Sequence, residues 1–227
     1  TGMAEIAQAH QLKLLYDAAH AFGSKLDGHS LFTFGDAAIG SFHSTKLFHT
    51  VEGGCIVTPK KEDAPELALL RAFGHVNDDH RCLGINAKLS ELHAAMGLAL
   101  LPAVPDLIRK RAQKTSLYAA LLGLPDEPGR FRSIRLAPGL EWNHAYYPLI
   151  FENGALMRKA LAALHKENIH PRRYFYPSLT QLPYIRAQKC AIAEDIASRI
   201  VCLPLWPDMD DAIIAKTAGI IRAASGI

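Results

Sequence analysis

Lys46 is the residue whose surroundings most clearly indicate chemistry. It lies in the run Ser41-Phe-His-Ser-Thr-Lys-Leu-Phe-His-Thr-Val-Glu-Gly-Gly54, among small hydroxyl residues and aromatics, and the glycines begin an apolar strand. These surroundings are unusual for a solvated surface lysine and favour a lysine at the bottom of a cleft. A buried or crowded ammonium loses its proton more readily, and the free amine can then condense with a carbonyl.

Three further polar residues have the types that would assist such a lysine. Asp17 and His20 are three residues apart, and Ser41 precedes Lys46 by five. Pyridoxal phosphate needs a lysine for its Schiff base, an acid for its ring nitrogen, a flat group for its ring face and donors for its phosphate. Lys46, Asp17, His20 and Ser41 could fill these four roles. An acid and a lysine in one cleft can also form a plain salt bridge, so the pair alone does not decide.

The elements predicted around these residues belong to a parallel α/β sheet. After a helix end at 3–11, the stretch 13–17 reads as a short buried strand that ends in an acid. Residues 37–42 predict a strand that enters the lysine loop, and 54–58 predict a third strand. Ligands of such open sheets bind at the carboxyl ends of the strands, where both the acid and the lysine are expected.

The clearest break in the pattern is Leu124-Pro-Asp-Glu-Pro-Gly129, which predicts a domain boundary. We therefore expect the C-terminal part of a large cofactor-binding domain at 1–124 and a small α+β domain at 125–227. Helices are predicted at about 64–74, 90–101, 104–122, 155–167, 190–200 and 210–224, a strand at 142–151 and an apolar turn at 202–207.

Three strands are too few to cover both faces of a parallel sheet and shelter a cleft. We therefore expect that upstream strands are missing or that a partner chain completes the fold. In either case the strand at 13–17 should lie near a sheet edge or be covered by a partner, because an exposed apolar edge is an aggregation hazard.

Composition excludes several classes of protein. The 227 residues are 49% apolar and 21% charged with a formal net charge of +3, which fits a soluble globular chain and does not point to nucleic acid. No run approaches the ~20 continuous apolar residues of a membrane span, and no leader is expected. Cys55, Cys82, Cys190 and Cys202 have no close-pair spacing, so we expect reduced, buried thiols and a cytoplasmic protein. The eleven histidines lack metal-ligand spacing, so no metal is expected.

The motifs resemble those of the DegT/DnrJ/EryC1/StrS family of sugar aminotransferases, which are fold type I pyridoxal phosphate enzymes. The resemblance covers nearly the whole chain in the right order, and the lysine motif is its most specific part. The matching stretches are Tyr16–Gly23, Ser41–Thr50 with Glu52–Gly54, and Gly84–Gly97, with weaker support from Arg173–Leu179 and Cys202–Leu205.

The resemblance implies a role for each site residue. Lys46 would hold the cofactor as an internal aldimine and shuttle protons, and Asp17 would pair with the pyridinium nitrogen. His20 would stack on the ring, and Ser41 would hydrogen-bond the phosphate. Asn86 would reach the phosphate of the other subunit's cofactor, so a homodimer is implied. A weaker assignment places Arg173, Tyr174 and Tyr176 at the nucleotide diphosphate of the substrate.

The implied reaction transfers the amine of glutamate to a nucleotide-linked 3-keto- or 4-keto-6-deoxyhexose. Dehydratase relatives carry histidine where this chain has Lys46. Many relatives carry arginine where this chain has Lys88, and a lysine cannot make the same planar fork. The family also has a longer N-terminal portion before the Asp17 motif, which holds part of the phosphate site. An inactive remnant that keeps only fold and dimer surface is therefore the alternative, and a histidine-based metal hydrolase has little support.

Overall fold

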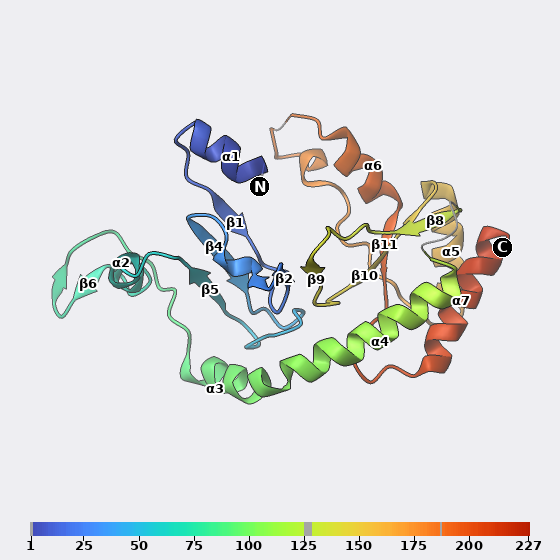
Figure 1. Ribbon diagram of the computed structural model, residues 1–227, viewed down its shortest axis with the longest axis horizontal. Coiled ribbons are helices and arrows are strands. Elements are labelled where there is room, and N and C mark those ends of the chain that lie inside the picture. Colours follow the sequence, from blue (N-terminus) through green and yellow to red (C-terminus); the bar gives the residue numbers. More distant parts are fainter. Residues whose placement is uncertain (1, 125–128, 187) are drawn as a thin grey trace. The chain divides into compact units, whose positions relative to one another are not determined.

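The computed structural model describes residues 2–124, 129–186 and 188–227 (Figure 1). These residues form two compact units. Unit 1 consists of Thr1–Asp106 with Pro138–Asn143, and unit 2 consists of Leu107–Ala137 with His144–Ile227. The bounds of the units differ from the predicted domains, because helix α4 continues from one unit into the other. At the predicted boundary, residues 125–128 lie outside the described part of the chain.

A three-stranded sheet in the order β1-β4-β5 forms the centre of unit 1. Its strands are β1 (Leu15–Asp17), β4 (Ala37–Ser41) and β5 (Gly54–Val57). β1 runs parallel to β4 and lies at the sheet edge, as expected, but β5 is antiparallel to β4. The expectation of a third parallel strand is wrong because a loop without a crossover helix joins β4 to β5, and such a loop can only return the chain antiparallel.

One face of this sheet is apolar and open to solvent within unit 1. Leu15 is 71% exposed, Ile39 50% and Ile56 55%. The register pairs Ile39 with Ile56, and Leu15 and Ile39 lie on the same face because side chains alternate along a strand. The expectation of a buried first strand is therefore wrong for the described residues, because they leave most of the Leu15 side chain exposed.

The other described elements of unit 1 are short hairpins and short helices. The β2–β3 hairpin is extended by β9, which comes from far along the chain. Strands of two residues are too short to give a periodic pattern, so the sequence does not predict them. These elements are α1 (Gly2–Ala9), β2 (Lys25–Leu26), β3 (His29–Ser30), η1 (Leu31–Thr33), α2 (Asp63–Leu70), β6 (His75–Val76), β7 (Asp79–His80), α3 (Glu91–Leu100), η2 (Leu101–Ala103) and β9 (Leu140–Glu141).

Unit 2 is built on an antiparallel sheet in the order β11-β10-β8, whose central strand is buried along its whole length. Helices α5 and α7 pack against each other, and α5 and α6 pack on β10. In the core the rings of Tyr118 and Tyr147 stack at 4.9 Å, and burial raises the pKa of Tyr118 to about 12. The elements are α4 (Val104–Leu122), β8 (Phe131–Ser133), β10 (Tyr147–Phe151), α5 (Gly154–Lys166), η3 (Leu179–Gln181), α6 (Ala191–Arg199), β11 (Ile200–Leu203) and α7 (Asp211–Ser225).

The helices of the sequence prediction are all found, but the apolar turn predicted at 202–207 begins inside strand β11. All four cysteines are free. Cys202 is buried as expected, whereas Cys190 is exposed. Among the described residues there is no group of three or more His, Cys, Asp or Glu that could hold a metal.

One helical stretch within the described ranges, Glu91–Leu122, is long and apolar enough to cross a membrane by length and composition. This differs from the expectation that no segment qualifies, which rested on uninterrupted apolar runs. Length and average composition are weak grounds on their own, because core helices of soluble proteins pass the same test.

Candidate active site

Two predicted site residues lie at the carboxyl ends of paired parallel strands. Asp17 is the last residue of β1 and pairs in register with Ile39, two residues before Ser41 at the end of β4. The Asp17 Oδ1 atom accepts a hydrogen bond from the Ala19 amide at 3.0 Å, which fixes the turn after β1. The pairing therefore brings Asp17 and Ser41 to one edge of the sheet, as predicted for a parallel pair.

Lys46 and His20 meet directly. The Nζ atom of Lys46 lies 2.9 Å from Nε2 of His20. The pKa of His20 is lowered, first because burial disfavours its charged form and then because Lys46 is a nearby cation, while Asp17 acts in the opposite direction. The ring is thus kept neutral near pH 7. An ammonium has only donors, so Nε2 is the acceptor while Lys46 carries its proton.

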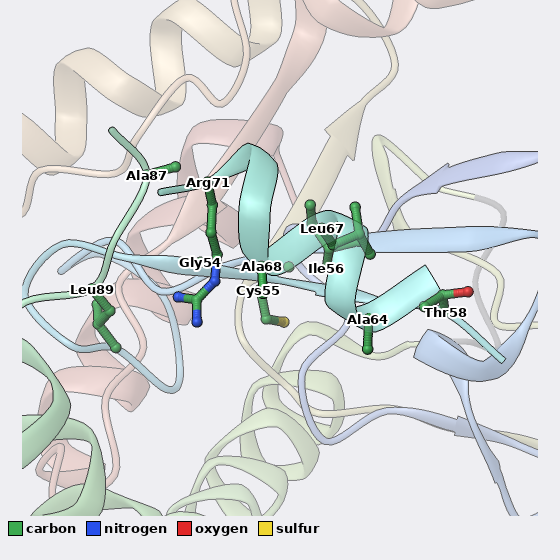
Figure 2. A pocket seen from close by; sticks show the side chains of 11 residues that line it. Gly54, Cys55, Ile56, Thr58, Ala64, Leu67, Ala68, Arg71, Ala87 and Leu89 are labelled. Carbon is green, nitrogen blue, oxygen red and sulfur yellow. The ribbon is translucent and has the colours of Figure 1, made fainter. Parts of the chain in front are cut away.

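Lys46 is only half-buried, and unit 1 by itself does not place it at the bottom of a cleft. A pocket with a volume of about 580 Å³ lies between the β4–β5 ribbon and α2. Figure 2 shows Cys55, Leu67, Ala68 and the Arg71 side chain at this pocket. The pocket is mainly apolar, and none of the predicted site residues lines it.

The lysine loop is the connection between β4 and β5, residues 42–53, and backbone hydrogen bonds join its two ends. The Phe42 amide donates to Gly53 O at 2.8 Å, and the Thr50 amide donates to Phe42 O at 2.9 Å. Phe48 in the loop stacks on Phe22 at 4.3 Å and meets Phe42 edge-on at 5.0 Å. This aromatic cluster packs the segment after Asp17 against the lysine loop, which brings the Lys46 and His20 segments together.

Helix α3 packs against the same loop at Gly97. A Cβ added at Gly97 would lie 2.8 Å from Cγ2 of Thr50 and 3.5 Å from the Phe48 ring. The glycine therefore allows the helix to approach the loop more closely than any other residue would. The N-terminus of α3 is capped by Ser90, whose hydroxyl accepts from the His93 amide.

Asn143 is a site-supporting residue that the sequence did not indicate. It is 2% exposed, and its Nδ2 donates to the carbonyl oxygens of His20 and Phe22 at 2.9 Å each. Its amide donates to Ser24 Oγ at 3.1 Å. Asn143 thus holds the backbone beneath His20 from more than a hundred residues away, and no local pattern could have revealed it.

The structure places Asn86 in the exposed segment between β7 and α3. Its Oδ1 accepts a hydrogen bond from Lys88 Nζ, and the Lys88 ammonium lies 3.9 Å from the centre of the Phe73 ring. Asn86 also forms an isolated bridge with Ala72. These contacts tie the asparagine to Lys88.

Arg173, Tyr174 and Tyr176 belong to unit 2. The Arg173 guanidinium lies 3.6 Å from the centre of the Tyr176 ring, and its Nη2 donates to the carbonyls of Ala197 and Ser198 at the end of α6. Tyr174 stacks on Tyr146 at 5.0 Å. The described contacts give Arg173 a structural task, and its role toward a nucleotide stays a prediction.

Comparison with known proteins identifies the family. The family model described as "DegT/DnrJ/EryC1/StrS aminotransferase family" matches residues 2–222. The chain belongs to this family. The resemblance inferred from the Lys46 and Asp17 motifs is thereby confirmed.

Named relatives within the family act on nucleotide sugars. The chain is 36% identical to a dTDP-4-amino-4,6-dideoxy-D-glucose transaminase of Shigella dysenteriae, over 97% of this chain and 61% of that protein. It is 29% identical to a UDP-N-acetyl-3-dehydro-alpha-D-glucosamine 3-aminotransferase of Acidithiobacillus ferrooxidans, over 97% and 59%. The chain thus spans about three fifths of the length of these relatives.

Solved structures of the family share the fold. The crystal structure of DesI in the presence of its TDP-sugar product superimposes with a TM-score of 0.87 at 31% identity, covering 98% of this chain and 58% of that one. A family aminotransferase of Brucella abortus gives a TM-score of 0.89 at 25% identity, covering 99% and 60%. The predicted α/β fold of fold type I aminotransferases is therefore confirmed.

Proposed function

We propose that this chain carries the cofactor-binding lysine of a pyridoxal phosphate-dependent aminotransferase for nucleotide-linked keto-6-deoxyhexoses. The observation that carries the proposal is the contact of Lys46 Nζ with His20 Nε2, beside the ends of the paired strands β1 and β4. A lysine and an imidazole are in contact there, and an acid and a hydroxyl end the two strands; these are the group types that pyridoxal phosphate requires.

Each residue has a task that its chemistry permits. Lys46 would bind the cofactor covalently through Nζ and carry protons at that atom. The Asp17 carboxylate would hold a proton on the ring nitrogen, and the His20 imidazole would pack on the ring. The Ser41 hydroxyl, which accepts from the His43 amide at 3.4 Å, would donate to the phosphate. When bound, the cofactor supplies the electron sink for exchange of an amine with a carbonyl.

The names of relatives support the class of substrate. The Shigella dysenteriae and Escherichia coli relatives, 36% and 33% identical, are named as transaminases of a dTDP-linked 4-amino-4,6-dideoxy sugar. Another relative is named for amination at carbon 3 of a UDP-linked sugar. We infer a keto-6-deoxyhexose on a nucleoside diphosphate as acceptor, aminated at carbon 3 or 4, with glutamate as donor and a cytoplasmic location.

A homodimer with a shared site is part of the proposal. Four apolar residues in the segment that contains Asn86 and in the helix α3 that follows it are each at least two-thirds exposed: Leu83, Ile85, Leu92 and Leu98. Apolar side chains gathered in this way favour a protein interface. We infer that a second copy covers this segment and that Asn86 then reaches the cofactor phosphate of the partner.

The second candidate is an inactive remnant that keeps only the fold and dimer surface. The chain spans about three fifths of the length of its relatives, so cofactor binding by this stretch has to be tested directly. The two candidates differ in whether the chain binds the cofactor covalently.

Absorbance spectroscopy separates them. The purified chain mixed with pyridoxal phosphate should develop the visible band of a lysine-bound cofactor, and Lys46→Ala should abolish it. Lys13→Ala, at an exposed lysine before β1, is the matched control and should keep the band. Absence of the band in the unaltered chain would favour the remnant. Turnover against a panel of 3-keto and 4-keto nucleotide sugars then identifies the acceptor.

A further inference from the structure

The His43 side chain contacts two separate parts of the lysine loop, and none of the residue roles proposed above depends on it. The ring of His43 lies between Thr45 and Glu52: its Nδ1 is 2.9 Å from Thr45 Oγ1, and its Nε2 is 3.5 Å from Glu52 Oε1. The side chain therefore joins the first part of the loop to its last part, with Lys46 between them.

The hydrogen bonds fix which nitrogen of His43 carries the proton. The Thr45 amide donates to Nδ1 at 3.2 Å, and a backbone amide can only donate, so Nδ1 must offer its lone pair. In the neutral ring the proton then lies on Nε2, the nitrogen that faces the Glu52 carboxylate. A histidine oriented by a carboxylate on one nitrogen presents the other in a fixed direction.

The main chain of His43 acts on the same segment. Its carbonyl accepts from the Lys46 amide at 2.9 Å, and its amide donates to Ser41 Oγ at 3.4 Å. His43 thus contacts Ser41 before the turn, Thr45 and Lys46 in the turn, and Glu52 near the end of the loop. Val51 in this loop has a φ of 67°, which a β-branched residue rarely adopts, so the loop needs such restraints.

We propose that His43 is a positioning residue for Lys46, because its Nδ1 accepts a hydrogen bond from the Thr45 amide and its Nε2 faces the Glu52 carboxylate. The proposal rests on the function proposed above for Lys46. What His43 does physically is to hold the backbone of residues 45 and 46 in one conformation, with or without cofactor. A displacement of about 1 Å in a reacting group can cost on the order of 100-fold in rate.

Hydrogen exchange of the full chain without cofactor tests the positioning directly. His43→Ala should raise the exchange rates of the Thr45 and Lys46 amides about tenfold or more. His43→Asn should restore protection at Thr45, because an asparagine Oδ1 can accept from the amide two residues on. His29→Ala, on the exposed β3 hairpin, is the matched control and should leave both amides unchanged. Unaltered exchange at Thr45 and Lys46 in His43→Ala would overturn the proposal.

Spectroscopy of covalent cofactor attachment adds a second readout. His43→Ala should form the lysine-bound band about 10- to 100-fold more slowly. In a Lys46→Ala background, the dissociation constant for non-covalent pyridoxal phosphate should be the same with His43 or Ala at that position. Attachment at the unaltered rate in His43→Ala would contradict the proposal. A chain that never forms the band would overturn the proposed function, and the exchange experiment would still decide the role of His43.

Discussion

Lys46 Nζ and His20 Nε2 lie 2.9 Å apart, so a lysine amine and a neutral imidazole share one hydrogen bond beside the ends of two parallel strands. A protonated His20 would place two cations at this distance, and the lowered pKa of His20 avoids that conflict. The contact therefore couples the charge of the lysine to the protonation of the ring that is proposed to cover the cofactor.

The lowered pKa of His20 predicts a pH dependence of stability. Because the pKa in the folded protein lies below the ordinary value of 6.5, the unfolded chain binds the proton at higher pH than the folded one. The free energy of unfolding should therefore fall as the pH drops below about 6.5. His20→Asn should make this fall shallower in denaturant titrations between pH 7.5 and 5. His29→Asn, on an exposed hairpin, should keep the slope of the unaltered protein, and an unchanged slope in His20→Asn would contradict the assignment.

Removal of the Asn143 side chain should loosen the backbone under His20. Asn143→Ala leaves the carbonyls of His20 and Phe22 without these donors and should lower the free energy of unfolding by about 1–3 kcal/mol. Chemical denaturation measures the loss. Asn143→Asp keeps the shape but has no donor, so it should be at least as damaging. An Asp variant as stable as the unaltered chain would show that the two hydrogen bonds do not matter.

Gly97→Ala tests whether the steric cost of an added methyl at the α3 contact exceeds the stability that alanine normally gives a helix. Alanine normally stabilises a helix interior by roughly 0.5–1 kcal/mol over glycine. At Gly97 the new methyl would meet Thr50 at 2.8 Å, so a net loss of about 1–3 kcal/mol is expected. Gly219→Ala in α7 is the matched control, because nothing lies within 4 Å of its added Cβ, and it should be stabilising. Thermal unfolding of both variants checks the opposite signs.

Arg173→Ala distinguishes a structural role from a substrate-binding role. Loss of the two hydrogen bonds to the end of α6 should lower the free energy of unfolding by about 1–3 kcal/mol. Arg186→Ala, at an exposed arginine, should have little effect on stability. Calorimetric titration with a nucleoside diphosphate tests the other role. A stable Arg173→Ala protein with weakened nucleotide binding would favour the substrate assignment instead.

The sequence predicted the parts of the fold that depend on local periodicity. The long helices α3, α4, α5 and α7 and the strands β1 and β4 lie where their patterns indicated. The direction of β5 was not predicted, because strand direction depends on the connecting segment. The loop after Ser41 was interpreted as part of a site, and its role as a hairpin connection was not recognised. The exposure of Leu15 was missed because an apolar pattern records a tendency to be covered, not what covers it.

The candidate site followed the same division. Lys46, Asp17, His20 and Ser41 could be chosen from residue types near predicted strand ends, and the structure brings the first and third into contact. Asn143 could not be chosen, because its partners lie 121 and 123 residues earlier in the chain. Such long-range hydrogen bonds leave no periodic trace.

β9 and Asn143 are far along the chain from the residues that they contact, so during synthesis they are made long after those residues. A ribosome adds about 5–20 residues per second, so the backbone at His20 waits on the order of ten seconds for a donor 123 residues downstream. The Lys46 loop is made within the first few seconds of that interval. During synthesis the lysine therefore exists before the backbone of its histidine partner is anchored, and the site is completed late, by a residue that performs none of its chemistry.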